Sequence, residues 1–401
     1  MLIKIDTRGE SIPSLLAMVV IFLMAIGTVF VFSAGANLTQ DLDLQRFYEF
    51  PGFRQLLFFP IACLLLYATA SFDYRRLSLS NGWLKSPTVY LLVLSIVLLV
   101  IVLLPQIGTE INRARRWLRI PLGAFSISFQ PSELAKWSLV FFLAAICDKY
   151  SSEIRLYWKR FIPVCLVVGL VVGLIIVEDF GTAAFIAFVS FLLMVVAGVK
   201  LWHLLTLLPI GLVGFFVELL RSRHRLERLA AFFAPEQWSD SLAYQANQSL
   251  VALGSGGLWG KGLGRGICKY GHLPEDTTDF VFAIVGEELG FVGAALVIGL
   301  FVLFVCLGTV VILRCRNRFG RLLAAGIVLT IGVQAALNIG VVTVVLPTKG
   351  IPLPFVSAGG TSMLLSSAAV GVLLNISRRC GYDENSEDRT QKAEQQLSSI
   401  D

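Results

Sequence analysis

Charged side chains are scarce in this sequence of 401 residues. Only 15% of the residues are Asp, Glu, Lys or Arg, whereas 56% are hydrophobic. A soluble domain usually carries about 25% charged residues, so this composition excludes an ordinary soluble protein of the same length. The chain is therefore predicted to be a polytopic membrane protein.

Residues that build common metal and catalytic sites are also few or scattered. The three histidines, His203, His224 and His272, lie far apart, and the seven cysteines show no paired spacing. These patterns indicate neither a metal cluster, nor an external disulfide, nor a catalytic triad. Lys261 is followed by Gly262 rather than Ser or Thr, so the glycine-rich run around it is not a nucleotide-binding loop. We expect no organic cofactor and no nucleic-acid partner.

Apolar runs long enough to cross a bilayer, about 20 residues each, recur along the chain. They lie at 13–33, 55–72, 87–105, 132–147, 161–177, 182–199, 201–220, 280–313, 322–346 and 360–377. We predict an all-α fold of about ten transmembrane helices, of which the fourth is short and the eighth long. The transmembrane domain should cover 1–379, with a large external loop at about 221–279 between helices 7 and 8.

Lysine and arginine predict the orientation, because cytoplasmic loops carry an excess of both. One side of the predicted bundle holds Lys4, Arg8, Arg75, Arg76, Lys85, Lys149, Arg155, Lys159, Arg160, Arg314, Arg316, Arg318, Arg321, Arg378 and Arg379. Both termini should therefore lie in the cytoplasm. Residues 380–401 are polar and are expected to form a disordered cytoplasmic tail.

Seven arginines run against this rule, because they fall in predicted external segments. They are Arg113, Arg115, Arg116 and Arg119 in one segment, and Arg221, Arg223 and Arg225 in the other. Their placement favours an external anionic ligand. Pairing with lipid phosphates at the outer surface is the alternative.

The external loop at 221–279 contains a glycine-rich run from Gly254 to Gly266. Its backbone amides could form an anion nest beside Lys261 and Arg265. A hinge or a re-entrant turn would explain the same glycines.

Three of the acidic residues that follow this run are candidate functional groups. Asp279 directly precedes the eighth apolar run, where it could cap the helix, act as a general base or bind a divalent cation. Glu287 and Glu288 lie two turns deeper, where ionisable groups are costly and often functional. Lys136 and Glu133 are their candidate partners, and an internal ion pair that fixes helix packing is the structural alternative.

The segment at 347–362 is too rich in proline to be helical, and Lys349 is its only charge. It is predicted to be an ordered external or re-entrant element. Gln334 and Asn338 lie one turn apart in the ninth run, so they could line the same cavity or bond across helices.

These motifs together resemble the SEDS family (shape, elongation, division and sporulation) of FtsW, RodA and SpoVE type. The matching strings are Arg115-Arg116-Trp117, Gln130-Pro131-Ser132-Glu133-Leu134-Ala135-Lys136, Asp179-Phe180-Gly181-Thr182, Gln248-Ser249 with the glycines to Gly264, Leu273-Pro274, Thr278-Asp279-Phe280, Gly286-Glu287-Glu288-Leu289-Gly290, Pro347-Thr348-Lys349-Gly350, Ser357 and Gly359-Gly360. The resemblance covers roughly 13–379. Each string is weak alone, but the ordered set is highly specific.

The resemblance implies a peptidoglycan glycosyltransferase that polymerises lipid II at the outer face of the cytoplasmic membrane. Asp279 would be the catalytic base, and a polyprenyl diphosphate would leave with inversion at the sugar. The substrate-binding residues would be Arg115, Arg116, Gln130, Ser132, Lys136, Gln248, Ser249, Lys261, Glu288, Lys349 and Ser357. A divalent cation, Mg or Mn, is an expected cofactor, with Asp179 and Asp279 as candidate ligands.

The implied partners are lipid II, the nascent glycan strand, a class B penicillin-binding protein that supplies the transpeptidase, and other divisome or elongasome membrane proteins. The strings around Arg116 and Lys349 are closer to the FtsW/SpoVE branch than to RodA, which favours a role in division. A lipid II flippase is the rival function, and a scaffold that only recruits a synthase is the third.

Four positions depart from the family pattern. Glu178 stands where the family usually has proline, and Phe180 replaces leucine. Ala358 stands where tyrosine is usual, and Thr361 where serine is usual. The extra carboxylate of Glu178 leaves the role of the neighbouring Asp179 open.

Overall fold

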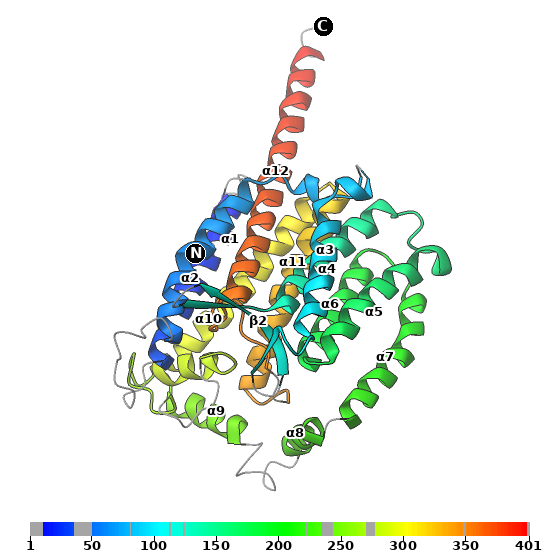
Figure 1. The fold of residues 1–401 in the computed structure, drawn as a ribbon. Helices are drawn as coiled ribbons and strands as arrows, with labels where there is room; N and C mark the ends of the chain where they lie inside the picture. The colour runs from blue at the N-terminus through cyan, green and yellow to red at the C-terminus, as the bar shows by residue number, and fades with distance from the viewer. Residues whose placement is uncertain are drawn as a thin grey trace.

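The computed structural model describes residues 11–35, 50–80, 82–111, 114–122, 125–221, 223–233, 244–269, 277–347 and 350–398. Each of the ten predicted apolar runs corresponds to one helix. These helices are α1 (Ser11–Gly35), α2 (Pro51–Ser71), α3 (Pro87–Val102), α4 (Pro131–Lys149), α5 (Ile162–Ile176), α6 (Phe180–Val196), α7 (Leu201–Arg221), α10 (Val281–Arg314), α11 (Arg318–Val342) and α12 (Gly360–Ser398). They form the bundle in Figure 1.

The bundle is that of a multi-pass membrane protein. Among the described residues, seven helices are long and apolar enough to cross a bilayer, and α3 and α6 are shorter apolar helices. Helix α4 lies deep in the bundle, where all but three of its 19 residues are buried, including Glu133 and Lys136. The predicted all-α membrane fold is confirmed.

Two of the segments predicted to be external contain regular secondary structure that the sequence analysis did not predict. The segment after α3 folds into an antiparallel sheet of three strands, β1 (Gly108–Ile111), β2 (Ala114–Leu122) and β3 (Phe125–Phe129), with β2 in the centre. The loop between α7 and α10 contains α8 (Arg223–Phe233) and α9 (Tyr244–Ser255). Helices α8 and α9 lie at the end of the bundle opposite the projecting end of α12 (Figure 1).

The C-terminal segment differs from the expected disordered tail, because α12 continues as a helix to Ser398 and extends beyond the bundle (Figure 1). The segment contains several Glu and Gln residues, which favour helix. A helix closes its own backbone hydrogen bonds, so it can project from the bundle without a core.

A disulfide joins Cys315, directly after α10, to Cys380 in α12. The two residues lie 65 positions apart in the sequence, so their spacing did not indicate that they pair. Only the helix packing brings them together.

Helix α10 is broken near its beginning at Gly290, which has φ 68° and ψ −163°. A break inside a membrane helix leaves backbone groups without intrahelical partners. The glycine-rich loop supplies these partners. The amides of Lys261 and Gly262 donate to the carbonyls of Glu287 and Glu288, both at 3.0 Å. After the break, the amides of Phe291 and Val292 donate to the carbonyls of Gly257 and Leu258, at 2.8 and 3.2 Å.

This close approach requires glycine on both sides. A Cβ atom on Gly290 would collide with the amide nitrogen of Gly260, and one on Gly260 would collide with the carbonyl of Glu288. The glycine-rich run therefore forms a backbone clamp around the break in α10.

We expect Gly290→Ala to lower the thermal stability of the detergent-purified protein, because Ala would be strained at a positive φ, by about 1–3 kcal/mol, and would also collide with the loop. Gly299→Ala in the same helix is the matched control, since a Cβ there meets no atom within 4 Å. Equal melting temperatures for the two variants would contradict the clamp.

Candidate functional site

A cavity of about 440 Å³ opens where the sheet, α8 and α9 meet the end of the bundle, within the usual size range of ligand sites. Its walls come from β2, α4, the α5–α6 turn, α7, α8, α9, the start of α10 and the proline-rich segment. The lining residues are Ala114, Arg116, Trp117, Gln130, Glu133, Asp179, Phe180, Gly181, Thr182, Leu219, Arg228, Leu229, Gln245, Thr278, Asp279, Phe280, Pro347, Gly350, Pro352, Ala358, Gly359 and Ser362.

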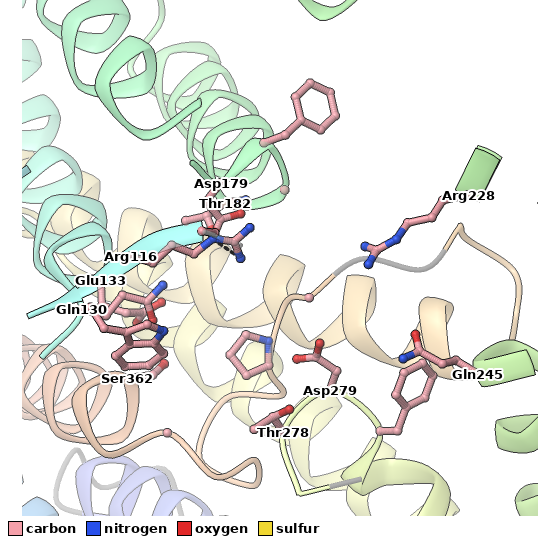
Figure 2. A pocket seen from close by; sticks show the side chains of 18 of the residues that line it. Arg116, Gln130, Glu133, Asp179, Thr182, Arg228, Gln245, Thr278, Asp279 and Ser362 are labelled. Carbon is pink, nitrogen blue, oxygen red and sulfur yellow. Dashed lines mark hydrogen bonds and ion pairs between the residues drawn. The ribbon is translucent and has the colours of Figure 1, made fainter. Parts of the chain in front are cut away.

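Arg116 enters the cavity from β2 (Figure 2). Its Nε donates to the carbonyl of Glu178 at 2.9 Å, and its Nη1 lies 3.3 Å from Oδ2 of Asp179. Arg115, the preceding residue, is not a lining residue, and its side chain pairs with the exposed Glu110 at 3.4 Å. The structure thus brings only one of the two predicted arginines to the site.

Asp179 lies at the cavity wall but is already engaged. It caps α6, since its Oδ1 accepts the Thr182 amide at 3.0 Å and its Oδ2 accepts the Thr182 hydroxyl at 2.9 Å. Oδ2 also pairs with Arg116. Within the described part of the chain, no group of three or more His, Cys, Asp or Glu residues could hold a metal ion. Asp179 is therefore primarily a helix cap and an arginine partner.

Asp279 faces the cavity from the turn before α10 (Figure 2). It is not the cap of that helix, because the N-cap residue is Phe280 and makes no side-chain cap bond. A Cβ atom on Gly350 would lie 3.1 Å from Oδ2 of Asp279, so the carboxylate lies directly against the proline-rich segment. Glycine at position 350 leaves room for this carboxylate.

Asn338 and Gln334 of α11 hold the backbone of the site in place. The Asn338 amide donates to the carbonyl of Asp279 at 2.9 Å and to that of Ile351 at 2.8 Å. The Gln334 amide donates to the carbonyl of Pro352 at 2.9 Å. Gln334 and Asn338 were predicted either to line a cavity or to bond across helices. They are not lining residues, and these amide bonds go to backbone carbonyls outside the helices, where Asn338 joins two walls of the cavity.

Arg228 of α8 is a site residue that the sequence analysis missed. Its guanidinium points into the cavity across from Arg116, with Asp279 between them in Figure 2. Burial lowers the pKa of Arg228, while the negative charge of Asp279 opposes this change and the positive charge of Arg116 adds to it. The three charges therefore act on one another.

Lys136 does not line the cavity but supports a residue that does. Its buried Nζ lies 2.7 Å from Oε2 of Glu133 and 3.0 Å from Oε1 of Gln334. Glu133 and the nearby Gln130 are lining residues, whereas Ser132 is buried outside the lining. Lys136 therefore compensates the charge of a carboxylate in the cavity wall.

Glu287 and Glu288 are fully buried, and the partners predicted for them, Lys136 and Glu133, were wrong. Glu287 pairs with Lys261 at 2.7 Å, and Glu288 pairs with Lys269 at 2.9 Å. The Glu288 carboxylate also accepts the hydroxyl of Ser33 in α1 at 2.8 Å. The geometry matches the alternative of an internal ion pair, because these groups fix the glycine clamp and lie outside the cavity lining.

Three other predicted residues also lie away from the cavity lining. Ser249 donates to the carbonyl of Val342 at 2.9 Å, and the hydroxyl of Ser357 accepts the Leu353 amide at 2.8 Å. Gln248 is not a lining residue, although Gln245 of the same helix is. Arg113 and Lys349 lie outside the described residues.

The chain is thus a multi-pass membrane protein with a polar cavity at one end of its helix bundle, and Asp279, Arg116 and Arg228 line this cavity. The sequence profile of the FtsW/RodA/SpoVE cell cycle proteins matches residues 13–381. The chain belongs to this family.

Relatives and solved structures agree with this assignment. The chain is 37% identical to the probable peptidoglycan glycosyltransferase FtsW of Trichlorobacter lovleyi, covering 90% of this chain and 92% of that protein. It is also 37% identical to the stage V sporulation protein E of Bacillus subtilis, covering 94% and 100%. A chain in a structure of a peptidoglycan synthase complex is similar with a TM-score of 0.70 and 26% identity, covering 91% and 97%. The rod shape determining protein RodA of Thermus thermophilus has a TM-score of 0.62 and 29% identity, covering 90% and 95%.

We expect Lys136→Met to destabilise the protein by about 3–5 kcal/mol, because it leaves the buried Glu133 carboxylate without its charge partner. Thermal unfolding of the detergent-purified variant measures this loss. The double variant Lys136→Met with Glu133→Gln removes both charges and should recover most of the stability. A double variant as unstable as Lys136→Met alone would contradict a compensating role for Lys136.

Proposed function

We propose that this protein is a peptidoglycan glycosyltransferase that polymerises lipid II into glycan strands at the outer face of the cytoplasmic membrane. The observation that carries the proposal is the cavity itself, in which Asp279 faces Arg116 and Arg228. Polymerisation of a lipid-linked sugar needs a base for the acceptor hydroxyl and fixed positive charge for a diphosphate leaving group. The relatives named as peptidoglycan glycosyltransferases support the same reaction.

In the proposed reaction, Asp279 takes the proton from the 4-hydroxyl of the acceptor GlcNAc. The acceptor oxygen then forms a bond to the anomeric carbon of the donor, and the bond from that carbon to the diphosphate oxygen breaks on the opposite face. The sugar inverts, and polyprenyl diphosphate leaves with the electron pair. One carboxylate is sufficient, because the diphosphate is a good leaving group once its charge is stabilised.

The two arginines suit this leaving group. A guanidinium carries five N–H donors in a planar fork that matches phosphate oxygens. Arg116 directs Nε and Nη1 to Glu178 and Asp179, so the rest of its fork is available for the cavity. Arg228 extends from the opposite wall. The diphosphate would lie between them, with the polyprenyl tail along the apolar helices.

A divalent cation is also part of the proposal. Asp279 lines the cavity, so its carboxylate could bind the cation together with the diphosphate oxygens. Asp179 is the other candidate ligand, and it also caps α6 and pairs with Arg116. Oxygen ligands of this kind are those that Mg²⁺ prefers, and Mg²⁺ is commonly held by one or two carboxylates together with substrate phosphates.

The setting follows from the family and the charge distribution. We propose that both termini lie in the cytoplasm, that the cell inner membrane holds the chain, and that a class B penicillin-binding protein crosslinks its product. Other divisome or elongasome proteins would join them. The similarity to a chain of a peptidoglycan synthase complex supports such a partner, and the FtsW and SpoVE relatives support a division-type role.

We expect Asp279→Asn to fold and insert normally but to lose polymerisation by about 10²–10⁴-fold, the usual contribution of a general base. The measurement is the glycan ladder formed from labelled lipid II by the purified chain, with and without its class B partner. Full activity of Asp279→Asn would remove the base assignment. Wild-type protein that moves lipid II across proteoliposomes but forms no glycan would instead identify a flippase.

Arg116→Ala and Arg228→Ala should each lower kcat/KM for lipid II by about ten- to a hundredfold, because a hydrogen bond to a charged group contributes about 1.5–3 kcal/mol. Arg115→Ala is the matched control, and its exposed pair with Glu110 should contribute little. An equal loss of kcat/KM in Arg115→Ala and Arg116→Ala would contradict the assignment of Arg116, and not Arg115, to the substrate.

A further inference from the structure

At the part of β2 next to the cavity, a side chain rather than a neighbouring strand accepts a backbone hydrogen bond from the strand edge. Strand β3 pairs with β2 only from Leu118 to Leu122. The preceding part of β2, which carries Arg115 and Arg116, has β1 as its neighbour among the described strands. Here the backbone amide of Arg115 donates to Oε2 of Glu178 at 2.8 Å.

The same turn holds the next residue of β2. The carbonyl of Glu178 accepts Nε of Arg116 at 2.9 Å, and the Asp179 carboxylate lies 3.3 Å from Nη1. Two consecutive residues of the α5–α6 turn therefore hold two consecutive residues of β2. Asp179 is itself fixed by Thr182 at the start of α6, so the turn is anchored to a bundle helix.

A long arginine side chain keeps considerable rotamer freedom, and a small shift at its backbone moves the guanidinium within the cavity. A binding group is effective only if the residues behind it hold its geometry. Glu178 is in a position to supply that support, because its side chain fixes the backbone before Arg116 and its carbonyl fixes the guanidinium.

We propose that Glu178 is a positioning residue for substrate binding, which acts through Arg116 by holding the backbone of Arg115. The inference rests on the proposed function, because it assigns Arg116 to the diphosphate. Glu178 does not line the cavity, so it contributes through geometry rather than through contact with the substrate.

The test measures steady-state polymerisation of labelled lipid II by the purified chain with its class B partner. Glu178→Ala removes the acceptor of the Arg115 amide and should lower kcat/KM about three- to tenfold, mainly through KM. Glu178→Gln keeps a side-chain oxygen that can accept the same bond and should stay within about twofold of wild type. Glu110→Ala is the control, since it removes only the exposed carboxylate paired with Arg115 and should have no effect.

A double-variant cycle separates positioning from a general effect on the fold. In the Arg116→Ala background, Glu178→Ala should cause no further loss, because the group that it positions is gone. An equal loss in both backgrounds would overturn the inference. So would a Glu178→Gln variant as impaired as Glu178→Ala, since charge rather than the hydrogen bond would then matter.

Binding of lipid II to the same variants, followed by native mass spectrometry, keeps the two hypotheses distinguishable. A wild-type chain that binds lipid II but forms no glycan would contradict the proposed function. The inference would then be judged on binding, which Glu178→Ala should weaken and Glu178→Gln should preserve. Unchanged binding and unchanged kcat/KM in Glu178→Ala would reject it.

Discussion

The site depends on the side-chain amide of Asn338, which donates to the carbonyls of Asp279 and Ile351. These two residues belong to segments that are remote in sequence, and neither segment is regular where they meet. Irregular backbone is tolerated at this depth only where other protein groups satisfy it. Helix α11 is a buried bundle helix. The hydrogen bonds of Asn338 and Gln334 therefore fix the backbone of the cavity walls to a rigid element. Asp279 is thereby held in place without serving as a helix cap.

The charged groups divide into two sets with different roles. Lys136, Lys261 and Lys269 each pair with a buried glutamate, and a buried carboxylate left alone would be strongly destabilising. These lysines therefore belong to the scaffold. Arg116 and Arg228 instead face the cavity from opposite walls. Arg116 and Arg228 do not pair with the three buried glutamates. Their positive charges lie at the cavity, where the proposed anionic substrate would bind.

Sequence reasoning succeeded where the pattern was local. Apolar runs predicted the bundle helices, and the polar pair Gln334 and Asn338, one helical turn apart, indicated side chains that bond beyond their own helix. It failed where the outcome depends on which remote groups meet. Glu287 was expected to meet Lys136, but the break at Gly290 brings the glycine clamp and Lys261 to it instead. The sheet, the Cys315–Cys380 pair and Arg228 were missed for the same reason. Glu178 was noticed only as a departure from the family pattern, and its contact with β2 required the fold.

The central claim is that Asp279 and the two arginines share one substrate in one cavity. A structure of the Asp279→Asn variant bound to lipid II tests it most directly, because the bound donor cannot be consumed. The account predicts the diphosphate within hydrogen-bond distance of Arg116 and Arg228, with the reacting sugar next to residue 279. A diphosphate bound elsewhere, for example at Lys261 and Arg265 on the glycine clamp, would contradict it.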